Sequence, residues 1–564
     1  MSMHRFFEIL PGTLAWLTLI LIVIFSRWLP VFTSVFIILF DIYWLLKTVY
    51  LSLHLRSTFS AMKKNLKVNW LSKLEELENN ANVTNNGTNA TNKIRSIRTP
   101  FVDSNYGMSW RDIYHLVILP MYREPYEVVR ESFESLVNAN YPKEKFIVVL
   151  ATEERGGRAA EETARKIERE FGSQFFKFLL TKHPWDISGE IPGKGSNETW
   201  AAKEAKRLII DPLLEAQSKS VPELTLEAKL CENQAKQREN FRKDSRMDSH
   251  SFAYGNVLVS VFDIDTQIFP EYFGRLTYVF LNAPNRLRAI YQPIPLFTNN
   301  IYKAPALARV IAFSSTFWQM MQQARAERLT SFSSQSLPFP VLLDIGFWHT
   351  DVVSEDSRIF WQGYLRYHGD FRVEPLLYPV SMDANVAPGF WETMKNNYRQ
   401  HRRWAWGCEN IPYMLDGFRK DPLIPKIKKW YWSFNAIEGF HSWATNALMI
   451  FALGWLPVLL GGKHFNASLL SYSLPQITKF IIQLSMLGVA SSAIVSILLL
   501  PPRPKWFRWH HYFLYFLQWI FIPATLIVFG AFPALEAQTR LALGGKWRLG
   551  FWPTPKSRSE IMRK

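Results

Sequence analysis

The chain has 564 residues, of which 48% are hydrophobic, and it carries a formal net charge of +17. Its two cysteines, Cys231 and Cys408, are too few for a disulfide scaffold or a thiolate zinc cage, so both classes are excluded. The positive charge is not accompanied by a zinc-finger spacing, an RNA-binding aromatic signature or a long basic tract. We therefore expect membrane lipid and a phosphate-bearing substrate as partners, and no nucleic acid.

Two apolar runs come first in chain order, at residues 6–25 and 31–50. Each has the ~20 residues that cross a bilayer core, which predicts two transmembrane helices within residues 1–52. A cleaved signal peptide is disfavoured because a second span follows at once and no small-residue cleavage site precedes it. The basic residues of the stretch 53–109 predict that this connector is cytoplasmic.

The middle of the chain, residues 110–415, has the pattern of a soluble α/β domain. Helical spacing at 127–138 lies between the first two of three short apolar runs, which gives a β-α-β unit. The three runs are typical of buried parallel strands and lie at 115–119, 146–150 and 256–262. Residues 203–250 are charged and helix-prone, and we interpret them as a solvated insertion.

Residues 416–442 mix lysine with tryptophan and tyrosine, which predicts an amphipathic helix in the membrane interface. Apolar runs within 443–535 predict about three further transmembrane helices, and residues 536–564 are interpreted as a basic tail. The runs lie at 443–460, 477–500 and 511–533. Five spans would place the basic tail outside, against the positive-inside rule, so the number of spans and the side of the tail stay open.

Polar residues with candidate chemistry follow each of the three expected strands. Asp263 and Asp265 form an Asp-x-Asp after the third strand, where two hard carboxylate oxygens suit Mg²⁺ or Mn²⁺ holding a diphosphate. Tyr122 and Glu124 follow the first strand and can stack on a base and accept from a ribose or base N–H. Glu153 follows the second strand and can take a similar role. The alternatives are chance loop acids, a first-turn glutamate at a helix N-terminus and an ordinary polar turn.

Two further patterns lie later in the domain. Glu355 and Asp356 are vicinal carboxylates, so mutual repulsion can raise one pKa and create a general base. The alternative is a helix start with Ser354 as the cap and both acids in the first turn. Gln400, Arg403 and Trp404 belong to a basic, aromatic stretch. Its arginine can bind phosphate and its tryptophan can stack against a sugar. The alternative is an amphipathic surface helix.

In this order, the motifs resemble glycosyltransferase family 2, specifically its membrane-integrated cellulose, chitin and hyaluronan synthases. Ser354-Glu355-Asp356 fits the family's acidic motif, and Gln400, Arg403 and Trp404 fit its Q-x-x-R-W motif. The resemblance implies a GT-A-like (Rossmann-like) α/β cytoplasmic catalytic domain, inserted between N- and C-terminal transmembrane helices. One departure is Glu153, where the family usually has aspartate.

The resemblance also implies roles residue by residue. Nucleotide binding falls to Tyr122, Glu124, Glu153, Lys194 and Asp263. Metal binding falls to Asp265 with Asp263, and Asp356 is the general base beside Glu355. Gln400, Arg403 and Trp404 line the acceptor and diphosphate side.

The implied reaction is inverting, metal-dependent transfer of a sugar from a UDP-sugar to a growing β-linked polysaccharide, with translocation across a bacterial inner or plasma membrane. The alternative is a single addition to a lipid or lipid-linked acceptor. A transporter with a degenerate transferase-like domain is disfavoured, because the sequence shows no internal repeat and keeps all of these acids.

Overall fold

The computed structural model describes residues 2–86, 108–220 and 254–555. Its centre is an eight-stranded sheet in the order β3-β2-β1-β4-β7-β6-β8-β5. The strands are β1 (Tyr114–Met121), β2 (Phe146–Glu153), β3 (Lys177–His183), β4 (Val257–Val261), β5 (Gln267–Ile268), β6 (Ala289–Phe297), β7 (Ser336–Pro338) and β8 (Arg372–Met382). Strands β3, β2, β1 and β4 are mutually parallel, so their carboxyl ends meet at one edge.

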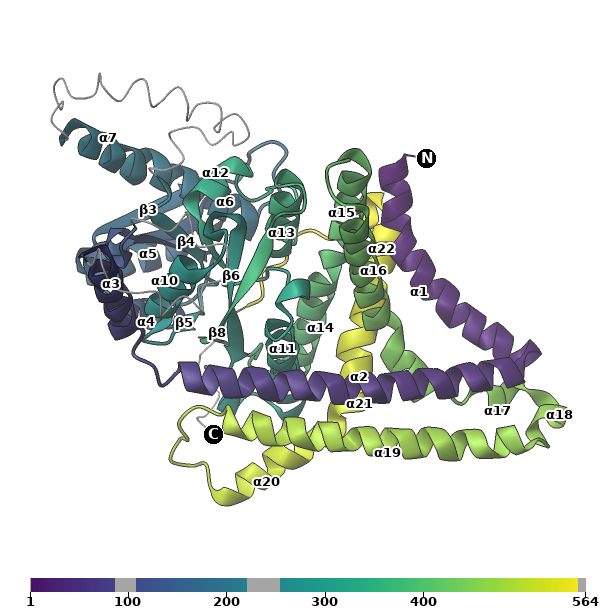
Figure 1. The fold of residues 1–564 in the computed structure, drawn as a ribbon. Helices are drawn as coiled ribbons and strands as arrows, with labels where there is room; N and C mark the ends of the chain where they lie inside the picture. Colours follow the sequence, from purple (N-terminus) through teal and green to yellow (C-terminus); the bar gives the residue numbers. More distant parts are fainter. Residues whose placement is uncertain (1, 87–107, 221–253, 556–564) are drawn as a thin grey trace.

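Helices cover both faces of the sheet (Figure 1). The helices of this domain are α4 (Tyr126–Val137), α5 (Arg158–Phe171), α6 (Lys194–Ala205), α7 (Asp211–Ser220), α10 (Tyr272–Asn282), α11 (Ala306–Gln323), α12 (Phe339–Asp344), α13 (Glu355–Arg366), α14 (Phe390–Ala405) and α15 (Asn410–Lys420). Alternate residues of β1 point to opposite faces. Val117 packs in one core with Phe133 of α4 and Phe273 of α10, and Ile118 packs in the other with Ala201 of α6 and Phe360 of α13.

The expected α/β class is confirmed, and so are the elements on which it was based. The runs at 115–119, 146–150 and 256–262 are strands β1, β2 and β4, and the stretch 127–138 is helix α4. These strands are recognisable because both of their faces are buried and their apolar runs are therefore continuous. The expected insertion at 203–250 begins with the end of α6 and with α7, but residues 221–253 lie outside the described residues, as do residues 87–107 of the connector.

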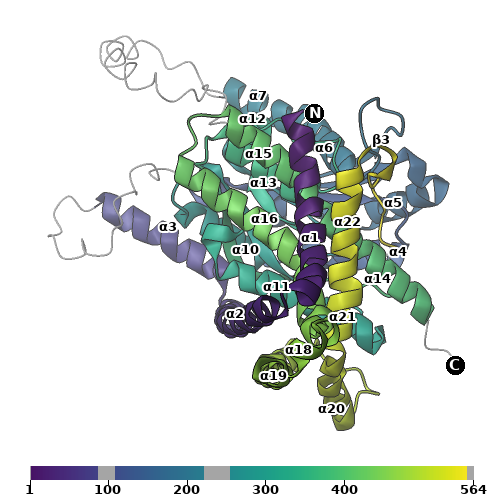
Figure 2. The same ribbon diagram turned by 90° about the vertical axis from the view of Figure 1, so that its right-hand side faces the viewer.

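Ten further α-helices are described; α3 packs against α10 of the sheet domain, and the others lie to one side of the sheet (Figure 1). They are α1 (Met3–Trp28), α2 (Pro30–Asn65), α3 (Trp70–Asn86), α16 (Lys426–Leu448), α17 (Leu456–Leu460), α18 (Gly462–Asn466), α19 (Leu469–Leu498), α20 (Trp509–Leu517), α21 (Ile522–Thr525) and α22 (Phe532–Leu543). Helices α2 and α19 pack along each other and extend away from the sheet (Figure 1). Helices α1, α16 and α22 pack together beside the domain (Figure 2).

Four described helical stretches are long and apolar enough to cross a membrane. They are α1, α2, α19 and the bent stretch Trp509–Leu543. Here the structure differs from the expected segment at 443–460. No helix breaker stands at the change of composition near residue 442, so α16 continues to Leu448 and into a π-helical turn, and the apolar run is then interrupted at Pro457 and Gly462.

The beginning of the expected basic tail at 536–564 is helical, since it forms the greater part of α22. Helix α22 continues to Leu543, and Glu536 and Arg540 form an ion pair of 2.7 Å one turn apart on it. The helix ends at Gly544, whose φ of +68° favours glycine. Residues 556–564 lie outside the described part of the chain.

Candidate active site

The carboxyl ends of β1 and β2 bring three candidate residues together. Tyr122 follows β1, and its backbone N–H donates to Glu124 Oε2 at 2.7 Å. Glu153, the last residue of β2, forms an ion pair with Arg155, whose guanidinium lies 4.6 Å from the centre of the Tyr122 ring. One arginine therefore joins the expected base-stacking tyrosine to the expected nucleotide-binding acid. Arg155 was not singled out from the sequence, although it lies only two residues after Glu153.

A cluster of charges lies at the same edge, around Lys194 at the start of α6. The Lys194 Nζ is 2.7 Å from Asp263 Oδ1, 3.4 Å from Glu198 Oε1 and 3.9 Å from Glu355 Oε1. Side chains from the end of β4, from α6 and from α13 thus converge on one ammonium group. Glu198, with a side chain only 2% exposed, was not singled out from the sequence. Its spacing of four residues from Lys194 on one helix was the available signal.

Burial and mutual repulsion control the charges of this cluster. Burial tends to lower the pKa of Lys194, but the charges of Asp263, Glu198, Glu355 and Asp356 outweigh it and raise that pKa well above its usual value. Burial raises the pKa of Glu198 to about 7, although Lys194 opposes the shift. Lys194 therefore stays protonated at neutral pH, and the cluster keeps more carboxyl groups than cations.

The two adjacent acids differ in their ionisation. Burial, reinforced by the charge of Asp356, raises the pKa of Glu355 well above its ordinary value. Burial also raises the pKa of Asp356, though not so far above its ordinary value, and the positive charges of Lys194 and Arg403 oppose the shift of both acids. We infer that Glu355 holds the proton of the pair and that Asp356 is the carboxylate, now a stronger base than usual.

The expected cap position of Ser354 is found, but its side chain does not cap the helix. Ser354 is the N-cap residue of α13, with Glu355 and Asp356 in the first turn, and its hydroxyl makes no capping hydrogen bond. Asp356 is fixed through its own backbone and side chain instead. The Ser331 hydroxyl donates to its carbonyl oxygen at 2.6 Å, and the Ser357 N–H donates to Asp356 Oδ1 at 2.8 Å.

Asp265 lies deeper than Asp263. It is fully buried, and its Oδ2 accepts from the Asp383 N–H at 2.9 Å, while Asn299 Nδ2 donates to its carbonyl oxygen at 2.9 Å. The described residues contain no group of three or more His, Cys, Asp or Glu side chains placed to hold a metal ion. Mg²⁺ and Mn²⁺ fit this donor set only with one or two carboxylates from the chain and further oxygens from a diphosphate and water. The surplus of carboxyl groups around Lys194 is consistent with such an ion.

The third candidate group lies on α14. Gln400 Oε1 accepts from Asn385 Nδ2 at 3.3 Å, and the Trp404 ring lies 6.0 Å from the ring of Phe297. Arg403 is close enough to Glu355 and Asp356 for its charge to lower both pKa values. Arg403 and the acid pair therefore lie close together, although about fifty residues separate them in the sequence.

A segment with no expected role covers part of this site. The Phe551 ring lies 5.3 Å from the Arg403 guanidinium, and a Cβ on Gly193 would come within 2.6 Å of that ring. Gly193 directly precedes Lys194, so a residue from the C-terminal part of the chain closes the site between α6 and α14. Nothing in the sequence pairs Phe551 with Gly193, because 358 positions separate them.

No family model matches this sequence, and no curated protein is similar to it. Among solved structures, a mannosyltransferase from Pyrobaculum calidifontis, PcManGT, in complex with GDP-Man and Mn²⁺, is 11% identical with a TM-score of 0.35, over 78% of this chain and 99% of that chain. Residues 1–349 of S. aureus TarS, in complex with UDP-GlcNAc, are 12% identical with a TM-score of 0.31, over 68% of this chain and 90% of that chain. Likenesses this distant assign no activity.

Proposed function

We propose that this chain is a membrane-embedded glycosyltransferase that transfers a sugar from a UDP-sugar to an acceptor hydroxyl with inversion at the anomeric carbon. One observation carries the proposal. Asp263, Lys194, Glu355 and Asp356 meet at the carboxyl ends of the parallel strands of the sheet, with Arg403 of α14 beside them. Open α/β sheets bind ligands at this edge.

The chemistry follows from the charges. Tyr122, Glu124 and Glu153 hold the nucleotide, and Lys194 and Arg403 face the diphosphate. Asp356 accepts the proton of the acceptor hydroxyl as that oxygen forms a bond to C1 of the sugar. The bond from C1 to the diphosphate breaks, and the nucleotide diphosphate leaves. A divalent ion held by Asp263 and Asp265 would neutralise charge on the leaving phosphate.

For the acceptor, we favour a growing β-linked polysaccharide that is moved across the membrane. Gln400 and Trp404 lie on α14, which packs against α22 of the apolar helices, and such an acceptor would enter from that side. The four stretches able to span a membrane support integration into the bilayer. The basic residues of the connector after α2 favour the cytoplasm as the side of the sheet domain.

One observation favours the alternative, a single addition to a lipid acceptor. A groove of about 340 Å³ lies between α1 and α22 and is lined by apolar side chains such as Trp16, Leu535 and Leu543. Glu536 in its wall pairs with Arg402, the neighbour of Arg403, at 2.7 Å. A lipid in this groove would lie beside the helix that carries the acceptor residues.

The test is a donor screen on detergent-purified protein with Mg²⁺ or Mn²⁺. Nucleotide release is measured with UDP-glucose, UDP-N-acetylglucosamine, UDP-glucuronate and UDP-galactose, and product size by mass spectrometry. We expect metal-dependent release that is lost with chelator. A high-mass, glycosidase-sensitive product supports the polysaccharide acceptor, and a small lipid-linked product supports the alternative. Folded protein that releases no nucleotide from any donor would contradict the proposal.

Variants test the roles of the acids in the same assay. We expect Asp356→Asn to lower turnover by roughly 10²–10⁴-fold, the usual effect of losing a general base, and Asp265→Ala to abolish metal-dependent transfer. Asp351→Asn is the matched control, because this acid lies five residues before Asp356 but its side chain is 69% exposed. Near-normal turnover by Asp356→Asn would remove Asp356 from the base role.

A further inference from the structure

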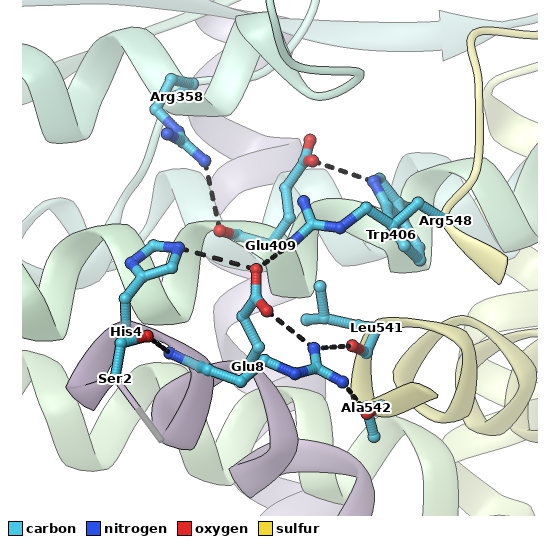
Figure 3. A network of polar contacts seen from close by, with 10 residues as sticks. Ser2, His4, Glu8, Arg358, Trp406, Glu409, Leu541, Ala542 and Arg548 are labelled. Atoms are coloured by element: carbon cyan, nitrogen blue, oxygen red, sulfur yellow. Dashed lines mark hydrogen bonds and ion pairs between the residues drawn. The ribbon is translucent and has the colours of Figure 1, made fainter. Parts of the chain in front are cut away.

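Glu409 connects the acid pair to the α14 motif. It ends the 3-10 turn Trp406–Glu409, which directly follows α14. Its Oε1 accepts three hydrogen bonds from the loop before α13: from the Val353 N–H at 3.1 Å, from the Ser354 N–H at 2.9 Å and from the Ser354 hydroxyl at 2.7 Å. Its Oε2 accepts from Trp406 Nε1 at 2.9 Å (Figure 3). One carboxylate therefore holds both segments.

A second set of contacts joins the first turn of α13 to the segment after α14. Arg358, one turn into α13, donates to the Glu409 carbonyl oxygen at 3.1 Å (Figure 3) and to Asn410 Oδ1 at 2.5 Å. Asn410 Nδ2 in turn donates to the Ser357 hydroxyl at 2.9 Å. The first turn of α13 is thus bound to the segment after α14 through its backbone and its side chains.

The other side of the acid pair is fixed by packing. A Cβ on Gly195, at the start of α6, would lie 2.9 Å from Glu355 Cβ and 3.1 Å from the His349 carbonyl oxygen. The acid pair is therefore enclosed between α6, which carries Lys194, and the segment held by Glu409. Loss of the hydrogen bonds to Glu409 would free the loop before α13 only on the side that faces α14.

We propose that Glu409 is a positioning residue, which locks Glu355 and Asp356 in place relative to Arg403 and Trp404. The inference rests on the proposed function, in which Asp356 is the base and α14 faces the acceptor. With Glu409 in place, the Asp356 carboxylate meets the acceptor hydroxyl. Without it, the base is misplaced relative to the acceptor, while the nucleotide side at Tyr122, Glu153 and Lys194 is unchanged.

The test compares Glu409→Ala and Glu409→Gln with wild type in the donor assay. Because a misplacement of about 1 Å can cost ~10²-fold in rate, we expect Glu409→Ala to lower kcat by roughly 10–100-fold. KM for the donor should stay within about threefold, since the nucleotide side is intact. The share of released nucleotide not matched by transferred sugar should rise. Glu409→Gln keeps an acceptor for Ser354 and should recover much of kcat.

The matched control is Trp406→Phe, which removes the indole donor to Oε2, leaves the three bonds to Oε1 and keeps an aromatic ring at this buried position. It should keep the wild-type ratio of transfer to nucleotide release. The inference would be overturned if Glu409→Ala keeps the wild-type kcat and the wild-type ratio of transfer to nucleotide release while Asp356→Asn is inactive. Parallel losses of kcat, donor affinity and melting temperature, without recovery in Glu409→Gln, would also overturn it, since that pattern indicates general unfolding.

Hydrogen exchange separates this inference from the proposed function. In Glu409→Ala, amides of residues 352–357 should exchange faster than in wild type, while those of α6 keep their rate. This readout needs no turnover, so it reports on the anchor even if no donor is used. Unchanged exchange at 352–357 would overturn the inference whatever the activity, whereas loss of activity in wild type alone concerns the proposed function.

Discussion

Lys194 explains how several carboxyl groups can be buried together at one edge of the sheet. Its ammonium group lies within 4.0 Å of three of them, and the nearest, Asp263, is at 2.7 Å. Buried charges are tolerated when they are paired, and a surplus acid becomes neutral instead. Glu198 and Glu355, both with raised pKa values, are the acids that respond in this way.

The raised pKa of Glu198 predicts a pH dependence of stability. The folded protein binds this proton up to about pH 7, whereas the unfolded chain releases it near the ordinary value of 4.5. The stability that this group contributes is therefore present below pH 4.5 and is lost as the pH rises through 7. Between pH 5 and pH 8, the melting temperature should fall less in Glu198→Gln than in wild type, measured by differential scanning fluorimetry. Equal slopes would contradict the assignment.

At the scale of elements, the site depends on two helix starts that touch. The N-terminus of α6 carries Lys194, the N-terminus of α13 carries Glu355 and Asp356, and Gly195 is the residue at which the two helices meet. No side chain fits between them, so the separation of the ammonium group from the acids is set by the absence of a Cβ.

Gly195→Ala should therefore disturb both stability and activity. Its Cβ would lie 2.9 Å from Glu355 Cβ and 3.1 Å from a backbone carbonyl oxygen, neither of which can move easily. Overpacking of this kind costs about 1–3 kcal/mol, and displacement of Glu355 should lower kcat. The control is Gly172→Ala, where the nearest atom would be 3.7 Å away. Chemical denaturation and turnover measure both effects, and equal behaviour of the two variants would contradict the packing argument.

At the scale of the whole molecule, α2 and α19 each have one end at the sheet domain and the other far from it (Figure 1). Asn65, at the end of α2, donates to the Leu377 carbonyl oxygen at 2.9 Å, and Tyr302 donates to the Pro501 carbonyl oxygen after α19 at 2.7 Å. At the other end, a Cβ on Gly462 would lie 3.8 Å from Arg27. The turns at 28–30 and 461–468 therefore share the distant end.

This arrangement predicts opposite accessibility for two engineered cysteines. Leu29, 52% exposed at the distant end, and Lys505, exposed after α19, are each replaced by cysteine in a Cys231→Ser background. Cys408 is retained because it is buried. A membrane-impermeant maleimide should label Leu29→Cys on intact cells and Lys505→Cys only after permeabilisation. Labelling of both from one side would show that the helices between them do not cross the bilayer.

The local sequence was sufficient to predict the strands β1, β2 and β4 and the acids that follow them. Those strands are buried on both faces, so their apolar runs are continuous and end abruptly in polar residues such as Tyr122, Glu153 and Asp263. Because strands β1, β2 and β4 are parallel neighbours, the order of motifs along the chain also predicted which edge of the sheet they share. The acid pair and the α14 motif were visible because each is contiguous or lies within one helical turn.

Only the tertiary structure decided the contacts between these motifs. Glu198 was overlooked because its importance depends on Asp263 and Glu355, which come from other elements. Glu409 and Phe551 were overlooked because they act on Ser354 and Gly193, which are 55 and 358 positions away in the chain. The composition also did not predict that α16 continues past residue 442. Local patterns describe the faces of a helix, but not the distant segments that pack against it. Residue pattern thus determined which chemistry the chain carries, and packing between distant segments decided which groups share a site and which of them keep their protons.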